Sequence, residues 1–442
     1  MTRIELKENG DPVDIQLSDR VGLALRSSGL VTATPAVEDG WWTVGPAASV
    51  GVARVADVEI WVQPKLPIRR LFFLLGYAND HRVWRDEALE LTEAPDLLRA
   101  IATAFARQAD RATQQGLLQG YRVKEEASPV LRGRLRTAEQ LKRRFGLPIP
   151  LEVRFDDYGV DVPENQLLRG AAERLLALSA IDARTRRILL RLVRATADLS
   201  PLRRGDRLPI WQASRLNARY HVVLRLAEIV LRGGSVEQAH GLVQVNGFML
   251  DMARVFEHFV TEALGDALRQ RGGHCKAQDP WHLDEDHLVR MKPDLVWYRT
   301  GSREPAAVID AKYKAEKPSG FPNADLYQML AYCSVTGLDR GHLVYAKGQE
   351  TQYRHQIREV GIEITQHTLD LDQQPDDLLA QVDVLAGVIA AESEAEPLPP
   401  GAANLANHTL KRNPERGLPV RGGVVPALLA DHLLTANGLQ DV

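Results

Sequence analysis

Two neighbouring apolar segments in the C-terminal half of the chain each carry an acidic residue at one end. Residues 291–298 contain Asp294 at the start of an apolar run, and residues 307–314 contain Asp310 and Lys312 at the end of another. Short apolar runs separated by a turn predict two strands. Because side chains of a strand alternate between its faces, Asp310 and Lys312 are expected on the same face. Two carboxylates and a lysine can therefore converge on one sheet surface.

This pattern has a chemical consequence, because unpaired charges at the end of a buried strand are costly. A divalent cation would offset that cost, and carboxylate oxygens suit Mg²⁺ or Mn²⁺. Such a cation clamps phosphate oxygens and activates water for hydrolysis of a phosphodiester. The backbone carbonyl of Ala311 offers another oxygen, and Lys312 would hold the attacking water and offset charge developing on the phosphate. The segments therefore predict a metal-dependent nuclease.

The Asp-x-Lys sequence is weak evidence on its own, because surface strands often carry charged pairs. Lys312 can also form a salt bridge with Asp310 or Asp294, which is compatible with catalysis. Lys314 continues the same face and either touches a phosphate or is surface charge. The apolar residues that precede Asp310 favour the catalytic interpretation.

Two predicted helices carry further candidates. Glu257 borders the apolar stripe of a helix expected at about 246–271, and it is either a surface residue or a further group at the metal. On a helix expected at 323–336, Gln328 shares a face with Asp325 and Tyr332. Gln328 either orients a water or contacts the scissile phosphate, or it makes an ordinary amide hydrogen bond.

Composition limits the remaining possibilities. A length of 442 residues predicts two or three domains, and an apolar share of 45% with a charged share of 26% is typical of soluble globular proteins. The sequence contains two cysteines, Cys275 and Cys333, and His258, His282 and His287 are not spaced as zinc ligands. We find no secretion signal and no transmembrane span, so we expect a cytoplasmic protein without a membrane partner. The sequence has no P-loop, so any nucleotide-hydrolysing motor must be a partner.

The distribution of charge bears on nucleic-acid binding more than the net charge of -3 does. Basic residues concentrate in three runs of the middle region, at 132–144, 184–194 and 203–207. Each run by itself is more often a solvated helix face. Together they make a DNA-facing surface plausible.

The periodicity of apolar residues predicts an α+β multidomain protein. Residues 1–66 alternate with period two and predict a β-rich module, followed by a mainly helical middle region with a short strand at 67–240. Residues 241–392 predict an α/β domain with a mixed central sheet, and 393–442 a poorly ordered tail with one short helix near 425–436. Helices are predicted at about 68–78, 95–116, 163–180, 182–198, 216–231, 246–271 and 323–336. Strands are predicted around 4–6, 13–17, 42–44, 58–65, 151–155, 342–346 and 356–364, besides the two acid-bearing segments.

Several motifs in combination resemble the McrC family, the nuclease subunits of McrBC-type, modification-dependent (type IV) restriction systems within the PD-(D/E)XK superfamily. The resemblance covers roughly residues 1–390. In the C-terminal half it rests on Phe256-Glu257-x-Phe259-Val260, Lys292-Pro293-Asp294, Ile309-Asp310-Ala311-Lys312-Tyr313-Lys314 and Asp325-x-Tyr327-Gln328-x-Leu330-x-Tyr332. Upstream it rests on Val62-Gln63-Pro64-Lys65, Leu74-Leu75-x-Tyr77-Ala78, Leu131-Arg132-Gly133-Arg134-Leu135 and Asp161-x-Pro163-Glu164-Asn165.

The resemblance implies a function and a division of labour. It implies a PD-(D/E)XK endonuclease domain at 241–392, with metal ligands among Asp294, Asp310, the Ala311 carbonyl and Glu257. Lys312 would be the catalytic lysine and Gln328 would support it. It also implies a McrB-like AAA+ hexamer, a GTPase or an ATPase, as partner. About residues 1–130 would engage that ring and stimulate nucleotide hydrolysis, and double-stranded DNA carrying a modification such as methylcytosine would be the substrate.

Two rival functions remain. The chain could be a non-cleaving adaptor that mainly stimulates the motor NTPase, although an adaptor has no need for Asp294, Asp310 and Lys312. It could also be a stand-alone exonuclease similar to the RecB nuclease domain. Many relatives of that kind hold an iron-sulfur cluster with four cysteines, which two cysteines cannot supply.

Overall fold

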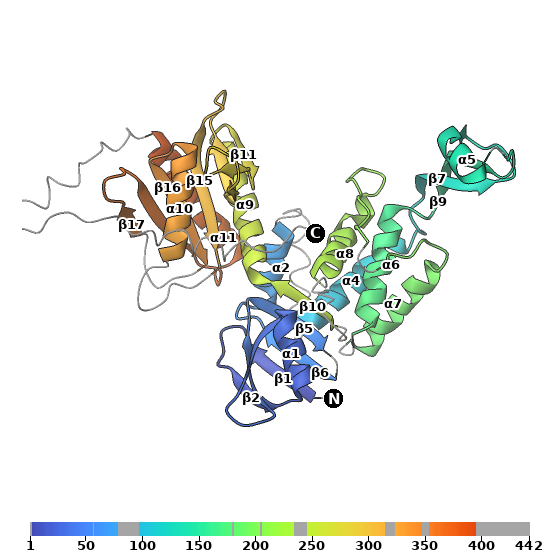
Figure 1. Ribbon diagram of the computed structural model, residues 1–442, viewed down its shortest axis with the longest axis horizontal. Helices are drawn as coiled ribbons and strands as arrows, with labels where there is room; N and C mark the ends of the chain where they lie inside the picture. The colour runs from blue at the N-terminus through green and yellow to red at the C-terminus, as the bar shows by residue number, and fades with distance from the viewer. Residues whose placement is uncertain are drawn as a thin grey trace, which may run out of the picture.

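Three groups of elements make up the computed structural model, shown in Figure 1 as an N-terminal module at the bottom, a helical part on the right and an α/β unit on the left. The structure describes residues 2–55, 57–77, 97–145, 147–178, 181–203, 206–233, 245–313, 323–346 and 353–394. It is a mixed α/β protein with several sheets, as the sequence predicted.

The N-terminal module consists of strands whose alternating apolar residues face a shared core. Its elements are β1 (Thr2–Lys7), β2 (Val13–Gln16), α1 (Asp19–Ser28), β3 (Val31–Pro35), β4 (Trp41–Pro46), β5 (Ser49–Val55) and β6 (Val58–Gln63). β2, β4 and β3 form one sheet, and β1, β6 and β5 belong to another. The four strands expected here are confirmed, whereas helix α1 was not predicted. Its apolar face packs into the module through buried residues such as Val21 and Leu25.

A strand from the second half of the chain completes this module. β10 (Val245–Asp251) pairs antiparallel with β5, so the sheet order is β1-β6-β5-β10. A Cβ on Gly51, which has φ +133°, would lie 2.1 Å from the Phe248 carbonyl oxygen, so the close approach of the strands requires glycine. The prediction that the long helix begins near residue 246 is therefore wrong. An apolar run of this length fits strand and helix alike, and the open edge of β5 decides the outcome.

The long helix follows β10 directly. In α9 (Met252–Gln270), the Asp251 side chain accepts hydrogen bonds from the Ala253 and Arg254 amides and so caps the helix. The Met252 amide donates to the Ala48 carbonyl at 3.0 Å, which fixes the first turn to the N-terminal module. The helix is therefore anchored in one sheet while its length runs along another unit.

The helical part confirms most of the predicted helices, with ends shifted by a few residues. Its elements are α2 (Ile68–Tyr77), α4 (Leu97–Thr113), α6 (Pro163–Leu176), α7 (Ala183–Ala195), the 3₁₀ helix η1 (Ala218–Tyr220) and α8 (His221–Gly233). Leu98, Phe105, Leu168 and Leu224 are among the fully buried side chains that join these helices. Pro163 at the start of α6 fits the first turn, where its missing amide has no helical partner.

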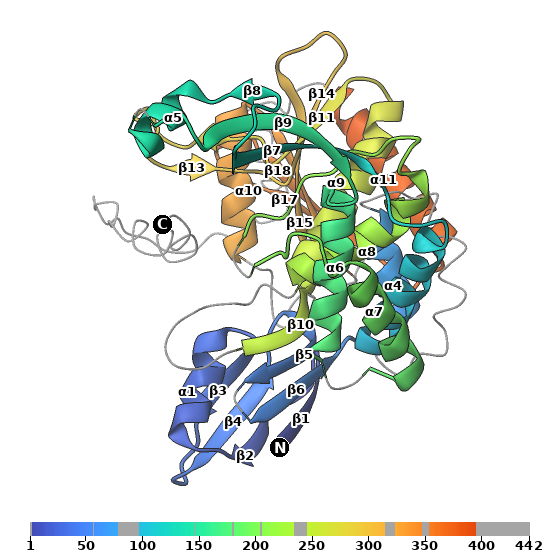
Figure 2. The same cartoon turned by 90° about the vertical axis from the view of Figure 1, so that its right-hand side faces the viewer.

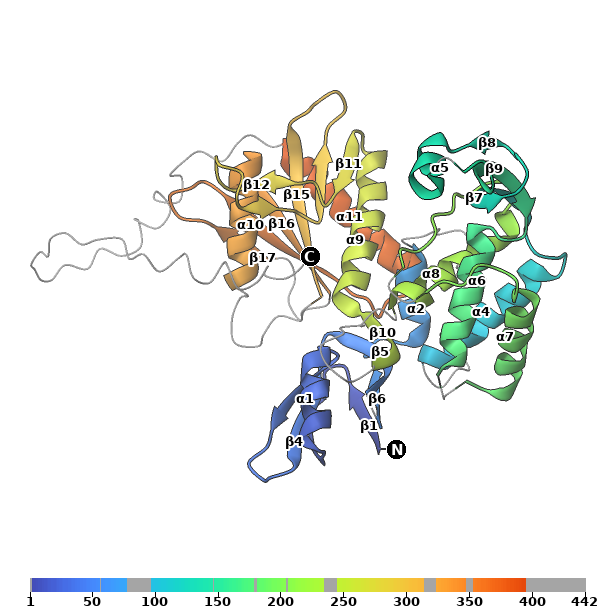
Figure 3. The ribbon, with the colours of Figure 1, turned by 45° about the vertical axis from the view of Figure 1, so that its right-hand side comes forward.

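A small arm between residues 120 and 159 projects from the helical part, as Figure 3 shows. It comprises β7 (Gly120–Ser128), β8 (Arg134–Leu135), α5 (Thr137–Arg144) and β9 (Leu151–Gly159), with the strand order β7-β9-β8. The sequence predicted only a short strand at 151–155. β7 was missed because most of its side chains are exposed and four of its nine residues are charged, which leaves no alternating apolar pattern.

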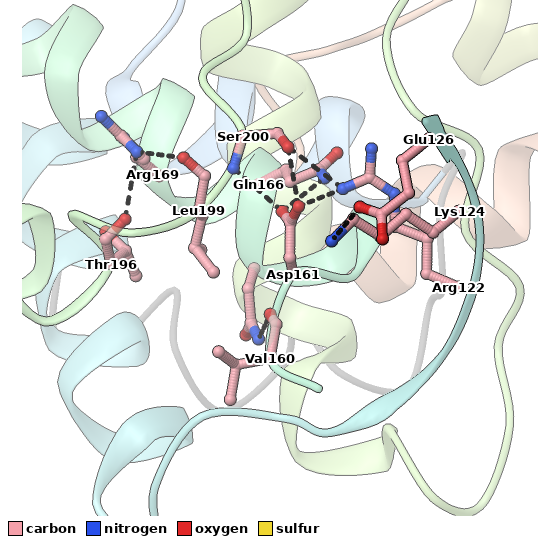
Figure 4. Close-up of polar contacts among 11 residues, drawn as sticks. Arg122, Lys124, Glu126, Val160, Asp161, Gln166, Arg169, Thr196, Leu199 and Ser200 are labelled. Atoms are coloured by element: carbon pink, nitrogen blue, oxygen red, sulfur yellow. Dashed lines mark hydrogen bonds and ion pairs between the residues drawn. The ribbon is translucent and has the colours of Figure 1, made fainter. Parts of the chain in front are cut away.

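The motif at Asp161 fixes the base of this arm to the helical part (Figure 4). The Asp161 carboxylate accepts hydrogen bonds from the Gln166 side chain at 2.7 Å and from the Ser200 amide and hydroxyl at 3.0 and 2.7 Å. It also pairs with Arg122 of β7. The buried Asn165 side chain donates to the Leu118 and Val160 carbonyls at 2.8 and 2.7 Å. This motif therefore has a structural role in holding the arm.

The C-terminal unit is built on a mixed sheet in the order β11-β14-β15-β16-β18-β17. Its strands are β11 (His274–Ala277), β14 (Leu295–Tyr298), β15 (Pro305–Lys312), β16 (Arg340–Ala346), β17 (Tyr353–Gln356) and β18 (Glu363–Leu369), with a hairpin of β12 (Trp281–His282) and β13 (Arg290–Met291) beside it. Helices α9 and α11 (Pro375–Glu394) share a core with one face, and α10 (Asn323–Thr336) packs on the other. Figure 2 shows the N-terminal sheets below this unit.

Two further differences from the sequence prediction occur in this unit. The strand expected at 356–364 is wrong, because this segment contains the turn between β17 and β18, where Glu359 and Gly361 have φ +63° and +71°. Helix α11 was not predicted, although it covers the sheet. Helix α10 and strand β16 are confirmed. The predicted tail helix lies outside the described residues, and the domain boundaries stay predictions.

Candidate active site

Strand pairing brings the two predicted aspartates together. β14 and β15 run antiparallel, and Leu295 lies opposite Ile309 as the last pair before Asp294. The Asp294 carboxylate thereby reaches the next free backbone amide of β15, and its Oδ2 accepts a hydrogen bond from the Ala311 amide at 2.8 Å. The convergence of Asp294 and Asp310 that alternation predicted is therefore present.

Both aspartates are in an environment that disfavours their charged forms. Burial, with the charge of Asp294 as the next cause, raises the pKa of Asp310 to about 7, and the residue is 2% exposed. Burial and the neighbouring Glu257 carboxylate raise the pKa of Asp294 to about 6. Such shifts arise where acids are gathered in a low-dielectric site, and they are frequent at functional sites.

Lys312 supplies the compensating positive charge. Its ammonium forms an ion pair with Asp310 and donates a hydrogen bond to the Gln328 Oε1 at 2.9 Å. Burial alone would lower the pKa of Lys312, but Asp310 and the surrounding acids outweigh it, so the pKa lies above its usual value. Lys312 therefore stays charged and is held from two sides.

Glu257 reaches the site from helix α9 through a residue that the sequence analysis missed. The Gln278 side-chain amide donates to the Glu257 Oε1 at 2.7 Å and to the Asp294 Oδ1 at 3.0 Å. Burial raises the pKa of Glu257 above its usual value. Gln278 follows β11 with φ +51°, in a turn with no motif, so no sequence signal indicated it.

Helix α10 contributes a chain of hydrogen bonds on the other side of Lys312. The Gln328 Nε2 donates to the Tyr332 hydroxyl at 2.8 Å, and that hydroxyl donates to the Lys292 carbonyl at 3.1 Å. The predicted shared face of Gln328 and Tyr332 is therefore present. Tyr332 also links the helix to the residue two before Asp294, which ties both sides of the site together.

The donor set fits a hard divalent cation. Mg²⁺ is usually bound by one or two carboxylates and keeps several waters, so Asp294 and Asp310 with a backbone oxygen are a suitable set. Among the described residues, no three His, Cys, Asp or Glu side chains form a ready-made metal cluster. Gln278 holds Glu257 and Lys312 pairs with Asp310, so these contacts would rearrange when a cation binds. The ligand roles of the Ala311 carbonyl and Glu257 stay predictions.

One of the remaining candidates, Lys314, falls outside the described residues, and Asp325 lies near enough to Lys312 for its charge to help raise the pKa of Lys312. The rings of His282 and His287 contact each other, with 4.6 Å between their centroids. Asp325 is buried and accepts a hydrogen bond from the Tyr345 hydroxyl at 3.2 Å.

The basic runs are partly neutralised by the protein itself. On the arm, Arg136 pairs with Glu125 at 3.1 Å and Arg144 with Glu152 at 2.9 Å. The second run lies on α7, and part of the third falls outside the described residues. These contacts reduce the charge that the arm can offer to a phosphate backbone.

Comparison with models of protein families identifies the family of this chain. The model of the family described as McrBC 5-methylcytosine restriction system component matches residues 45–346. The chain belongs to this family. The match spans β5 to β16, the part of the chain that contains Glu257, Asp294, Asp310 and Lys312.

A solved structure of a McrBC assembly shares the fold. A chain of the tetradecameric assembly of Thermococcus gammatolerans McrB AAA+ hexamers with bound McrC matches with a TM-score of 0.53 and 18% identity, over 87% of this chain and 99% of that chain. A chain of the Thermococcus gammatolerans McrBC complex matches with a TM-score of 0.37 and 19% identity, over 60% and 88%. A search of curated proteins finds no match. No helix within the described residues is long and apolar enough to span a membrane.

Proposed function

We propose that this McrBC-family chain is the endonuclease subunit of a modification-dependent restriction complex. The observation that carries the proposal is the meeting of Asp294, Asp310 and Lys312 at one end of the adjacent strands β14 and β15, with both carboxyl pKa values raised. This arrangement suits the C-terminal unit to the PD-(D/E)XK nuclease fold. The substrate would be double-stranded DNA, and the family description points to 5-methylcytosine as the modification.

The residues at the site have different roles in the proposed reaction. Mg²⁺, or Mn²⁺, held by Asp294, Asp310 and the Ala311 carbonyl with Glu257 nearby, would stabilise phosphate oxygens and promote ionisation of the attacking water. Lys312 orients that water and offsets negative charge developing on the phosphate. Gln328 keeps the Lys312 ammonium in place, and Gln278 holds the carboxylates of Glu257 and Asp294.

Supplying the substrate requires a partner. The sequence has no P-loop of its own. The similar Thermococcus gammatolerans assembly contains McrB AAA+ hexamers with bound McrC. We infer that a McrB-like AAA+ hexamer, using GTP or ATP, binds this chain and delivers DNA to its site. The region before about residue 130 would contact the ring.

Co-purification with an AAA+ partner, followed by cleavage of methylated and unmethylated DNA with Mg²⁺ and nucleotide, tests the proposal. Wild-type complex should cut methylated DNA, and Asp310→Asn should lose at least about 10³-fold in rate because a ligand carboxylate is removed. Nucleotide hydrolysis and complex formation should persist in Asp310→Asn. Full cleavage by that variant would overturn the assignment. Stimulated nucleotide hydrolysis without cleavage by the wild type would instead indicate an adaptor.

A further inference from the structure

The end of the catalytic strand is in contact with the N-terminal module. β15 pairs with β16 as far as Lys312, which lies opposite Tyr345 as the last residue of the ladder. Beyond that point no strand within the described residues holds the backbone of β15. The side-chain contacts of the next residue, Tyr313, with neighbouring elements therefore hold the end of this strand.

Lys65 of the N-terminal module covers the Tyr313 ring. The Lys65 ammonium lies 4.5 Å from the ring centroid, which is the geometry of a cation–π contact. Lys65 closes the Val62-Gln63-Pro64-Lys65 motif just after β6, and Tyr313 belongs to the motif that contains Asp310 and Lys312. Two motifs that are about 250 residues apart in sequence thus meet through one contact.

Glu8 holds the backbone of Lys65. The Glu8 side chain is buried at the end of β1, and its Oε2 accepts a hydrogen bond from the Lys65 amide at 2.9 Å. The buried Tyr313 hydroxyl has no hydrogen-bond partner among the described residues. It lies near enough to Glu8 for the carboxylate charge, after burial, to raise the pKa of Tyr313. Glu8 therefore contacts the Lys65 backbone and lies beside the Tyr313 hydroxyl, so it is common to both partners of the cation–π contact.

The Tyr313 ring also lies beside the helix that carries Glu257. Its centroid lies 6.0 Å from that of Phe256, which precedes Glu257 on α9. Helix α9 is itself continuous with β10 of the N-terminal sheet and packs on α2 through Phe73 and Phe259, whose ring centroids are 5.8 Å apart. The N-terminal module thus contacts both elements that carry Lys312 and Glu257.

We propose that Lys65 and Tyr313 form a relay by which the N-terminal module positions Lys312 for cleavage. Lys65 and Tyr313 are positioning residues, since neither touches the reacting atoms. The inference rests on the proposed nuclease function. It names the contact through which a change in the N-terminal module would alter the position of Lys312. A partner that binds this module would act on the nuclease through the relay.

The test uses the full-length chain and its AAA+ partner. Lys65→Met removes the charge and keeps the length of the side chain, whereas Lys65→Arg retains a cation over the ring. Arg3→Met is the matched control, because Arg3 lies over Trp61 at 4.3 Å in a similar contact on the same module. Hydrogen exchange of residues 309–313 in metal-free chain and the kcat and KM of DNA cleavage are measured for each variant.

Lys65→Met should speed exchange in this segment and lower kcat, each about five-fold. A cation–π contact contributes a free energy that corresponds to about this change in an equilibrium or a rate. The KM for DNA and partner NTPase stimulation should not change, and Lys65→Arg should restore kcat. Tyr313→Leu should give the same loss, and the double variant should lose no more than either single variant. Additive losses, an equal loss in Arg3→Met, or wild-type exchange and kcat in Lys65→Met would overturn the relay. Absence of cleavage by the wild type would refute the nuclease function instead. The hydrogen exchange of Lys65→Met would then still test the relay.

Discussion

Replacing Asp310 by Asn should abolish cleavage and, without metal, make the protein more stable. The buried Asp310 carboxyl has its pKa raised from 3.8 to about 7, chiefly by burial and by the charge of Asp294. At neutral and higher pH, ionisation of Asp310 is therefore less favourable in the native state than in the unfolded chain. At about 1.4 kcal/mol per pH unit, this difference corresponds to about 4 kcal/mol of lost stability.

The sign of the effect follows from the direction of the pKa shift. Below the ordinary pKa of 3.8 the carboxyl is protonated in both states, so Asp310 brings no penalty. As the pH rises towards about 7 the unfolded state ionises first and stability falls, and the full penalty is present above that value. Asn cannot ionise, so Asp310→Asn should match the wild type at about pH 4 and exceed its stability at about pH 8.

Urea-dependent hydrogen exchange of β14 and β15 peptides in chelator-treated protein measures this stability. Asp198→Asn, which replaces an exposed acid on another unit, is the matched control and should change nothing at either pH. Adding Mg²⁺ should stabilise the wild type and leave Asp310→Asn unaffected, because ligand binding to the native state raises its stability. An Asp310→Asn variant that is no more stable than the wild type at about pH 8 would refute the reasoning.

Three further predictions follow from the same contacts. Lys312→Met should slow cleavage by about 10²- to 10³-fold with partner NTPase stimulation unchanged, and normal cleavage would exclude its electrostatic role. Gln278→Ala should raise the Mg²⁺ concentration for half-maximal cleavage by about ten-fold, because it frees Glu257 and Asp294; an unchanged Mg²⁺ titration would contradict this. Burial lowers the pKa of His367 to about 4, beside His342, so protonation favours unfolding. Stability should fall by about 3 kcal/mol as the pH drops from about 6.5 to about 4 through His367 alone. His367→Leu should reduce the acid sensitivity seen in thermal denaturation and leave the contribution of the buried His342, whose pKa is also lowered; an unchanged sensitivity would count against it.

The core of the candidate site could be predicted because its signal is local. Asp294, Asp310 and Lys312 lie within or next to two short strands, and alternation alone determines which face each side chain takes. Gln328 and Tyr332 are four residues apart on one helix, so their contact follows from helical geometry.

Other parts of the site have no local signal. Gln278 lies in a turn and meets Glu257 and Asp294 only because β11 and α9 pack beside the same strands. Lys65 and Tyr313 are each ordinary in their own segments, and their contact exists only after the N-terminal module docks on the end of β15. A pattern of neighbouring residues cannot report such a pairing, because it depends on distances between elements.

The sequence by itself determined the β-rich start of the chain, most of the helices and the acid-bearing hairpin, because periodicity of apolar side chains decides which backbone form can bury them. Only the tertiary structure decided that residues 245–251 form strand β10, because the open edge of β5 satisfies their backbone hydrogen bonds. The same edge joins the start of α9, and hence Glu257, to the N-terminal module. Connections of this kind depend on which surfaces remain unpaired after local structure forms, and that is a property of the whole fold.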